Sequence, residues 1–130
     1  MTPVSMNVIQ ADVGVAGIYG FTTLRAKGTS DAPFQSLNFG DHVGDDPQKV
    51  KFNRDILRDS LPGNVPPRWL QQIHGVDVVA AHLLAEGEVP VADAIWTDRP
   101  GMAVAVMTAD CLPIVLAGLH SDWVAIVHAG

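Results

Sequence analysis

Three residues with metal-binding or nucleophilic side chains lie where apolar segments of this sequence give way to polar ones. His74 and His128 each end an apolar segment, and Cys111 lies in a polar break between two such segments. Binding and catalytic residues gather where strands meet loops. Imidazole and thiolate groups are good zinc ligands, and three protein ligands with a fourth position left open form a catalytic zinc site. The three residues are therefore candidate zinc ligands, although they do not form a local motif.

The same residues allow two other interpretations. Cys111 could be a nucleophilic thiolate, with His74 or His128 as its base. A cysteine in an apolar segment is more often a small buried residue without chemistry, and a histidine beside a turn is more often an ordinary polar residue. The residue types alone leave all three interpretations open.

Further polar residues could take part in binding or proton transfer. Asp93 and Asp110 are candidate general acids or bases, although an aspartate in a loop more often caps a turn. A polar loop over residues 25–39 is longer than most connections, and long loops are often functional. Arginine, hydroxyl, amide and imidazole groups together can hold a phosphate or sugar hydroxyls, or can simply be solvated. The candidate substrate contacts in or just after this loop are Arg25, Ser36, Asn38 and His42.

Short strands and at least one helix, in an α/β or α+β chain, are the elements expected to position these residues. The clearest helix covers residues 47–61. Asp46 is a good N-cap for it, and Pro47 suits its first position. The last two apolar runs are typical of strands covered on both faces, and we expect the final one to lie inside a sheet rather than at its edge. Strands are predicted at residues 8–15, 17–23, 68–74, 77–82, 93–97, 102–108, 113–117 and 123–127.

Composition excludes several classes of protein. The chain is 48% hydrophobic and 17% charged, which suits one small globular domain. Eight lysines and arginines against fourteen acidic residues leave a net charge of −6, so we expect no nucleic-acid partner. No apolar stretch reaches the roughly 20 residues of a membrane span, so we expect no membrane partner. A single cysteine and the lack of a signal-peptide pattern predict a cytoplasmic protein.

Several blocks of the sequence, taken together, resemble the laccase-domain family, also called multicopper polyphenol oxidase or purine nucleoside phosphorylase proteins. The blocks occur in the order that the family has, and each is weak alone. They include Phe21-Thr22-Thr23, Ser36-Leu37-Asn38-Phe39-Gly40, Gln71-Gln72-Ile73-His74-Gly75, Ala92-Asp93-Ala94, Thr108-Ala109-Asp110-Cys111-Leu112-Pro113 and Val127-His128-Ala129-Gly130.

The resemblance implies a zinc enzyme whose partners are purine nucleosides and phosphate. Members are described as phosphorolysing adenosine, inosine and methylthioadenosine and as deaminating adenosine. Carried over by motif, the family's zinc ligands are His74, Cys111 and His128. A multicopper oxidase would need many histidines, normally with His-x-His pairs, and the five histidines here include no such pair. Polyphenol oxidation is therefore disfavoured.

The resemblance also implies an α+β fold, with mixed β-sheets and flanking helices in a layered α-β-β-α sandwich. Family members continue beyond the block that ends this chain, so we expect residues 1–130 to be a single domain truncated at its C-terminus. The exposed apolar strand at that end would allow a homodimer. Two alternatives to the enzyme are a non-catalytic zinc-binding fragment and a cysteine hydrolase without zinc.

Overall fold

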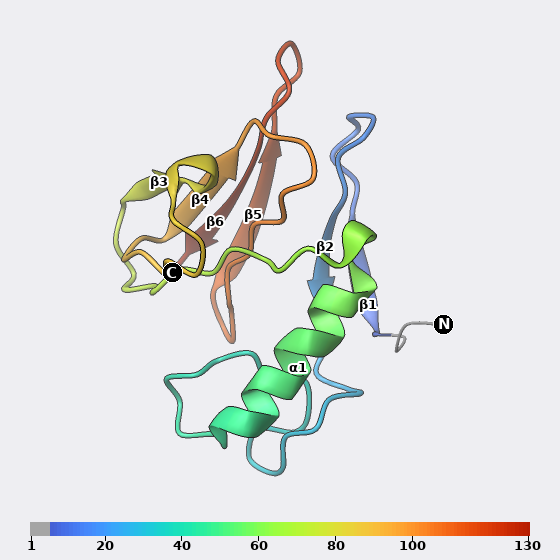
Figure 1. Ribbon diagram of the computed structural model, residues 1–130, viewed down its shortest axis with the longest axis vertical. Coiled ribbons are helices and arrows are strands. Elements are labelled where there is room, and N and C mark those ends of the chain that lie inside the picture. The colour runs from blue at the N-terminus through green and yellow to red at the C-terminus, as the bar shows by residue number, and fades with distance from the viewer. Residues whose placement is uncertain (1–5) are drawn as a thin grey trace. The chain divides into compact units, whose positions relative to one another are not determined.

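The computed structural model describes residues 6–130 of the chain (Figure 1). These residues form two compact units. The first consists of residues 6–10 and Phe21–Val65, and the second of Ala11–Gly20 and Pro66–Gly130. Two sheets and one α-helix among them confirm the predicted α+β class. The prediction of a single domain stays a prediction. In chain order the elements are β1 (Val8–Ala11), β2 (Gly20–Thr23), α1 (Pro47–Ser60), η1 (Pro62–Asn64), β3 (Val78–Ala80), η2 (Ala81–Leu83), β4 (Ala94–Thr97), β5 (Leu112–Ala117) and β6 (Val124–Ala129).

Helix α1 of the first unit begins and ends almost where the sequence predicts. The Asp46 side chain accepts a hydrogen bond of 2.9 Å from the Gln48 backbone N–H, and Pro47 opens the first turn, where it has no N–H to leave unpaired. Leu61 is extended and ends the helix. The buried apolar residues of the helix are Val50, Ile56 and Leu57. No helix among residues 6–130 is long and apolar enough to cross a membrane.

Strands β1 and β2 pair as a two-stranded sheet, but both are shorter than predicted. Gly14 and Gly17 have φ angles of 66° and 82°, a backbone region that glycine adopts readily. Asp12 accepts a hydrogen bond of 2.9 Å from the Gly14 N–H. A turn therefore occupies residues that the β-branched pattern assigned to the ends of two strands.

The second unit contains a four-stranded sheet with the order β3-β4-β6-β5. β3 and β4 are parallel, and β4 and β5 are both antiparallel to β6. β6 is thus an interior strand, as its continuous apolar run predicts. The register pairs Ala94 with Val127 and Leu112 with Ala129. The starts of β3, β4 and β5 therefore share one end of the sheet with the end of β6.

Two predicted strands, at residues 68–74 and 102–108, are wrong. The structure has only isolated bridges there, between Arg68 and Val104 and between Gln71 and Val91. The Gln72 side chain takes the place of further pairing, because it accepts a hydrogen bond from the Met107 N–H and donates one to the Met107 carbonyl, both at 2.7 Å. These segments are apolar because they line the core, not because they belong to a sheet.

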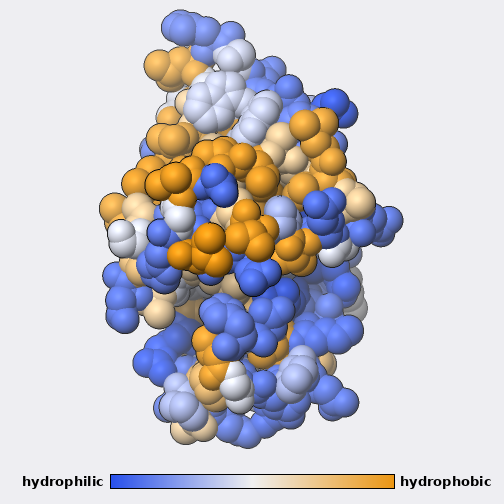
Figure 2. All heavy atoms as spheres, turned by 90° about the vertical axis from the view of Figure 1, so that its left-hand side faces the viewer, coloured by the Kyte–Doolittle hydropathy of each residue, from blue (hydrophilic) through white to orange (hydrophobic). Residues whose placement is uncertain are grey.

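The core of the second unit lies against this sheet. Ile95 of β4 and Ala81 of η2 are fully buried and pack with Leu70 and Ala92. Figure 2 looks at the face that carries β3 and η2, where apolar side chains gather among polar ones. Between residues 70 and 92, the exposed large apolar residues are Ile73, Val76, Val78, Leu83, Val89 and Val91.

Candidate metal centre

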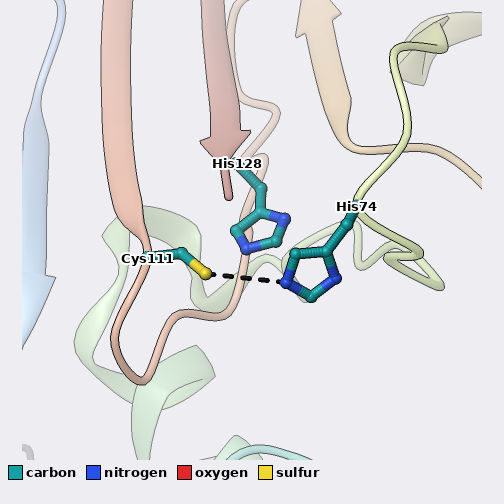
Figure 3. Close-up of side chains that lie close together, drawn as sticks. All are labelled: His74, Cys111 and His128. Atoms are coloured by element: carbon teal, nitrogen blue, oxygen red, sulfur yellow. Dashed lines mark hydrogen bonds between the residues drawn. The ribbon is translucent and has the colours of Figure 1, made fainter.

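His74, Cys111 and His128 meet at the end of the sheet where the four strand ends converge (Figure 3). Their ligand atoms all lie within 4.8 Å of one another, and Cys111 Sγ is 3.6 Å from His74 Nε2. The two imidazole rings meet edge to face, with centroids 4.8 Å apart. Ligand atoms around a tetrahedral zinc ion lie roughly 3.5 Å apart, given bond lengths of about 2.0–2.3 Å. A small closure of the cluster would let one ion contact all three residues.

Strand pairing explains why residues so distant in sequence come together. His128 belongs to β6 and opposes Pro113 of β5. Cys111 immediately precedes β5, so it lies beside the end of β6 that carries the histidine. His74 lies in the turn that leads to β3, at the same end of the sheet. One ligand thus lies on a strand of the sheet, one directly precedes a strand, and one lies in a turn.

The backbone around His74 is unusual in two respects. His74 has a φ of 60°, the left-handed region that a residue with a side chain occupies only when its surroundings hold it there. Gly130 packs against its ring, because a Cβ built on that glycine would lie 2.4 Å from His74 Cδ2. A glycine at this position leaves room for the His74 ring to face the other two ligands.

Asp93 lies behind the cluster, with only 2% of its surface exposed. Its carboxylate is 2.7 Å from His128 Nδ1 and accepts three backbone hydrogen bonds, from the N–H groups of Ile73, His74 and Gly75. Burial raises the pKa of Asp93, but these hydrogen bonds outweigh it and hold the pKa at about 2. Asp93 is therefore a carboxylate at neutral pH.

The donor set fits a borderline or soft metal ion. One thiolate and two imidazoles suit zinc or Cu(I), whereas Mg²⁺, Ca²⁺ and Mn²⁺ favour oxygen ligands. Because Nδ1 of His128 faces Asp93, Nε2 is the atom that faces the cluster. His128 is buried, Cys111 half-buried and His74 exposed. The cluster therefore opens to solvent on its His74 side, where a fourth ligand could enter.

The other predicted residues take different places. Asp110 is exposed and immediately precedes Cys111, but it is outside the group of ligand atoms. The four predicted substrate contacts belong to the first unit, whereas the three candidate ligands belong to the second. These four contacts are Arg25, Ser36, Asn38 and His42. The roles of these residues and of Asp110 in substrate binding and catalysis stay predictions.

The loop that carries the predicted contacts is shaped by its own hydrogen bonds. Arg25 Nε donates to the Gln35 carbonyl at 2.9 Å. The Ser36 hydroxyl accepts from the Gly28 N–H and donates to the Arg25 carbonyl. The Asn38 amide donates to the Gly40 carbonyl. His42 and Arg25 are exposed, so they are the two members of the set whose side chains are most accessible to a ligand.

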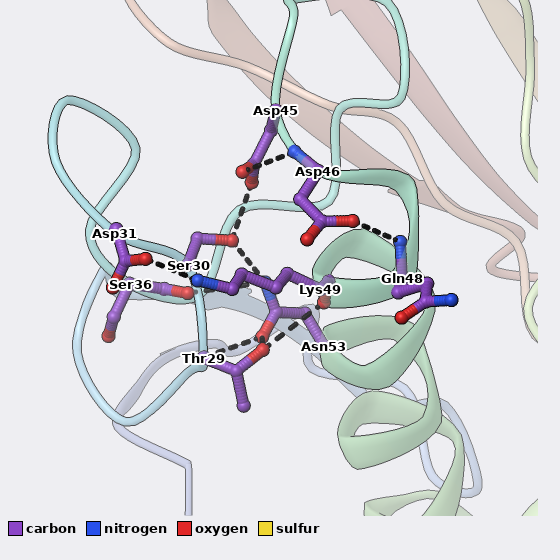
Figure 4. A network of polar contacts seen from close by, with 9 residues as sticks. All are labelled: Thr29, Ser30, Asp31, Ser36, Asp45, Asp46, Gln48, Lys49 and Asn53. Carbon is purple, nitrogen blue, oxygen red and sulfur yellow. Dashed lines mark hydrogen bonds and ion pairs between the residues drawn. The ribbon is translucent and has the colours of Figure 1, made fainter.

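Asn53 of α1 fastens this loop to the helix (Figure 4). The side chain is completely buried. Its amide nitrogen donates to Ser30 Oγ and to the Ser36 and Asn38 carbonyls, and its oxygen accepts from the Thr29 N–H and hydroxyl. Ser30 in turn donates to Asp45, and this bond and one from Asn38 hold the pKa of the Asp45 carboxyl below its ordinary value. No sequence pattern indicates this role, because an asparagine inside a predicted helix is ordinarily an exposed polar residue.

The sequence of this chain is similar to that of a known protein family: the profile of the multi-copper polyphenol oxidoreductase laccase family matches residues 19–130. A protein of Pseudomonas aeruginosa, named a purine nucleoside phosphorylase, is 45% identical over 115 residues, which are 88% of this chain and 46% of that protein. One of Streptomyces coelicolor with the same name is 42% identical over 124 residues, 93% of this chain and 50% of its own length.

Solved structures agree with the sequence matches. The crystal structure of a Neisseria meningitidis protein aligns with a TM-score of 0.86 at 42% identity, covering 95% of this chain and 50% of that one. YlmD from Geobacillus stearothermophilus aligns with a TM-score of 0.78 at 36% identity, covering 88% of this chain and 46% of that one. The chain thus spans about half the length of the relatives it matches.

The metal centre predicts a specific effect of Cys111→Ala. The Cys111 thiolate is the one sulfur among the three candidate ligands, so its loss should weaken metal binding by more than the roughly 10–100-fold that loss of an outer partner costs. In the cobalt-substituted protein, the thiolate-to-metal charge-transfer band should also disappear. Competition with a chelator and absorption spectroscopy measure the two effects. His120→Ala is the control, because His120 is an exposed histidine outside the cluster. Equal affinities in the two variants would contradict the ligand assignment.

The Asn53 contacts predict a loss of stability on Asn53→Ala. The substitution leaves buried donors and acceptors without partners, which should lower the free energy of unfolding by roughly 1–3 kcal/mol. Denaturant unfolding followed by circular dichroism measures it. Lys51→Ala on the same helix removes only an exposed ion pair with Asp55 and should change stability by less than about 0.5 kcal/mol. A difference between the variants smaller than the experimental error would show that Asn53 does not hold the loop.

Proposed function

The chain belongs to the multi-copper polyphenol oxidoreductase laccase family, and from that premise we propose that it carries the metal centre of a zinc-dependent purine nucleoside phosphorylase. Relatives that are 42–45% identical bear the name purine nucleoside phosphorylase. The observation that carries the proposal is the convergence of His74, Cys111 and His128 to within 4.8 Å. An enzyme that transfers a ribosyl group to phosphate would take a purine nucleoside and phosphate as substrates.

The number of ligands supports one metal ion rather than several coppers. Within residues 6–130, one group of three or more candidate ligands is found, and it uses two of the five histidines. His42 and His82 instead lie near Asp41 and Asp98, with nitrogen–oxygen distances of 3.8 and 3.7 Å. A multicopper oxidase needs several centres with different geometries, and these residues do not supply them. We therefore propose zinc, with polyphenol oxidation disfavoured.

In phosphorolysis, a phosphate oxygen forms a bond to the anomeric carbon of ribose. The bond from that carbon to the purine nitrogen breaks, its electron pair goes to the base, and an acid protonates the base. Asp110, which is exposed and adjacent to Cys111, is the proposed residue that passes a proton from solvent to the leaving base. Arg25 is the proposed phosphate contact: of its three guanidinium nitrogens, only Nε donates a hydrogen bond to another described residue, so the two terminal nitrogens can form a fork toward an anion. Ser36, Asn38 and His42 remain the proposed contacts to the rest of the substrate.

Deamination of adenosine is the second proposed activity. His74, Cys111 and His128 would hold the zinc ion, which would supply Lewis-acid activation of water. The water oxygen forms a bond to the carbon that carries the amine, the bond from that carbon to the amine nitrogen breaks, and the nitrogen leaves as ammonia. Asp110 is again the proposed proton carrier. The sole cysteine is a candidate ligand rather than a disulfide partner, which is consistent with the proposed cytoplasmic location.

One observation favours a second candidate function. Cys111 Sγ and His74 Nε2 are 3.6 Å apart, which is also the arrangement of a thiolate nucleophile and its base. A cysteine hydrolase without zinc would use this pair and leave His128 without a chemical role. The zinc enzyme is preferred because it uses all three residues.

Assays with adenosine test the proposed function. With phosphate, the protein should release adenine and ribose phosphate, and without phosphate adenine release should stop. The Pseudomonas aeruginosa relative, about twice as long, is the positive control. Asp110→Asn should lower kcat by about 10²–10⁴-fold, the usual contribution of general acid–base catalysis. Adenine release that does not depend on phosphate would contradict phosphorolysis. Activity in the relative alone, with zinc bound to both proteins, would favour a zinc-binding fragment.

A further inference from the structure

We propose that Asp93 is the positioning residue of the metal centre, and that its carboxylate sets both the tautomer of His128 and the backbone conformation of His74. The inference rests on the proposed metal-binding function. It assigns to Asp93 a role different from the general acid or base that the sequence suggests. Three sets of contacts carry it: those to the His128 ring, those to the turn at residues 73–75, and those of the Asp93 backbone.

The contact with His128 determines which ring nitrogen carries the proton. His128 Nδ1 lies 2.7 Å from Asp93 Oδ2, and both side chains are more than nine-tenths buried. A carboxylate can only accept a hydrogen bond, so Nδ1 must carry the hydrogen. In a neutral imidazole the lone pair is then on Nε2, the atom that faces Cys111 and His74 in Figure 3. Asp93 thus holds His128 in the one neutral tautomer that can bind a metal through Nε2.

The contacts with the turn determine where His74 lies. The N–H groups of Ile73, His74 and Gly75 all point at the Asp93 carboxylate, at 3.1, 3.0 and 2.8 Å. Three consecutive backbone N–H groups can point at one carboxylate group only if the backbone turns sharply. His74, with its φ of 60°, is the residue at which it turns. The left-handed residue is therefore held by the same carboxylate that orients the other histidine.

The Asp93 backbone fixes the carboxylate with respect to the sheet. Its carbonyl accepts a hydrogen bond of 2.8 Å from the His128 N–H, and its own N–H donates to the Asp77 carbonyl at 3.2 Å. Asp93 comes directly before β4, whose first residue, Ala94, pairs with Val127 of β6. The carboxylate that contacts both His128 and the turn of His74 is thus anchored at the start of β4 and beside the end of β6.

The same contacts leave Asp93 unsuited to proton transfer with a substrate. Oδ1 accepts from Ile73 and Gly75, and Oδ2 accepts from His74 and His128. Two carboxylate oxygens offer about four lone-pair positions, and four donors occupy them. With 2% of its surface exposed, the residue has no face left for a substrate. Asp93 acts through the ligands that it holds.

The variant Asp93→Asn tests the proposal with almost no change in shape. An amide has one acceptor atom and one donor group where the carboxylate has two acceptors. If the amide nitrogen faces His128, it donates to Nδ1, and the ring proton moves to Nε2, where it blocks metal binding. If the amide oxygen faces His128, the nitrogen opposes the backbone N–H groups of the turn. Zinc affinity should fall about 10–100-fold in either case, as for other outer partners of ligating histidines.

Two measurements are made on the 130-residue chain. Competition with a chelator gives the zinc affinity, and ¹⁵N NMR of the imidazoles at alkaline pH, on metal-free protein, gives the tautomer of His128. The native protein should show hydrogen on Nδ1, and Asp93→Asn should show it on Nε2 or a mixture. Asp45→Asn is the matched control: it removes one carboxylate that accepts side-chain hydrogen bonds in the first unit, and it should change neither measurement.

The outcomes separate this inference from the proposed function. Native zinc affinity in a folded Asp93→Asn protein, or native metal-free protein with hydrogen on Nε2 of His128, overturns the inference. If Asp93→Asn does not fold, the tautomer in the native protein still decides. If the native protein binds no zinc but His128 carries its hydrogen on Nδ1, the positioning role stands and the proposed metal function fails.

Discussion

A buried carboxylate is the constraint around which the second unit is arranged. An isolated charge in a protein interior is strongly unfavourable, so Asp93 must be surrounded by donors. Those donors come from two places that are far apart in sequence, the turn at residues 73–75 and the end of β6. Satisfying the charge therefore brings together the two histidines that face Cys111. The hydrogen bonds that satisfy the Asp93 charge are therefore the same contacts that position two of the three candidate ligands.

The two units are stabilised by different means. The second has an apolar core around Leu70 and Ile95, with the charged site at one end of its sheet. In the first, a long polar loop is held by a buried network centred on Asn53, with Ser30 and Asp45 beyond it. Buried polar networks of this kind are costly when any partner is lost, and they specify one loop conformation when complete. Arg25 on this loop and His42 just after it are exposed, and their contact with a substrate stays a proposal.

Elements whose signals are local were predicted well from sequence. Helix α1 has its cap at Asp46 and its stop at Leu61, and β6 is an interior strand, as its apolar run over residues 124–127 predicts. The ends of β1 and β2 were missed for a local reason, the turn at Asp12 and Gly14, whereas the two predicted strands that are wrong fail for long-range reasons. Residues 68–74 and 102–108 look like strands because Leu70 and its neighbours line the core, but the Gln72 side chain replaces the ladder between them. The candidate ligands were predictable by residue type, whereas the part played by Asp93 depends on contacts that only the fold creates.

The proposed metal centre binds a single metal ion through one sulfur and two imidazole nitrogens. X-ray absorption spectroscopy of the zinc-loaded chain measures that coordination directly. We expect one sulfur at about 2.3 Å and two imidazole nitrogens at about 2.0–2.1 Å, with a lighter atom completing the shell. A first shell of nitrogen and oxygen only, or one with two or more sulfur atoms, would contradict it, because the chain has a single cysteine to give to each ion.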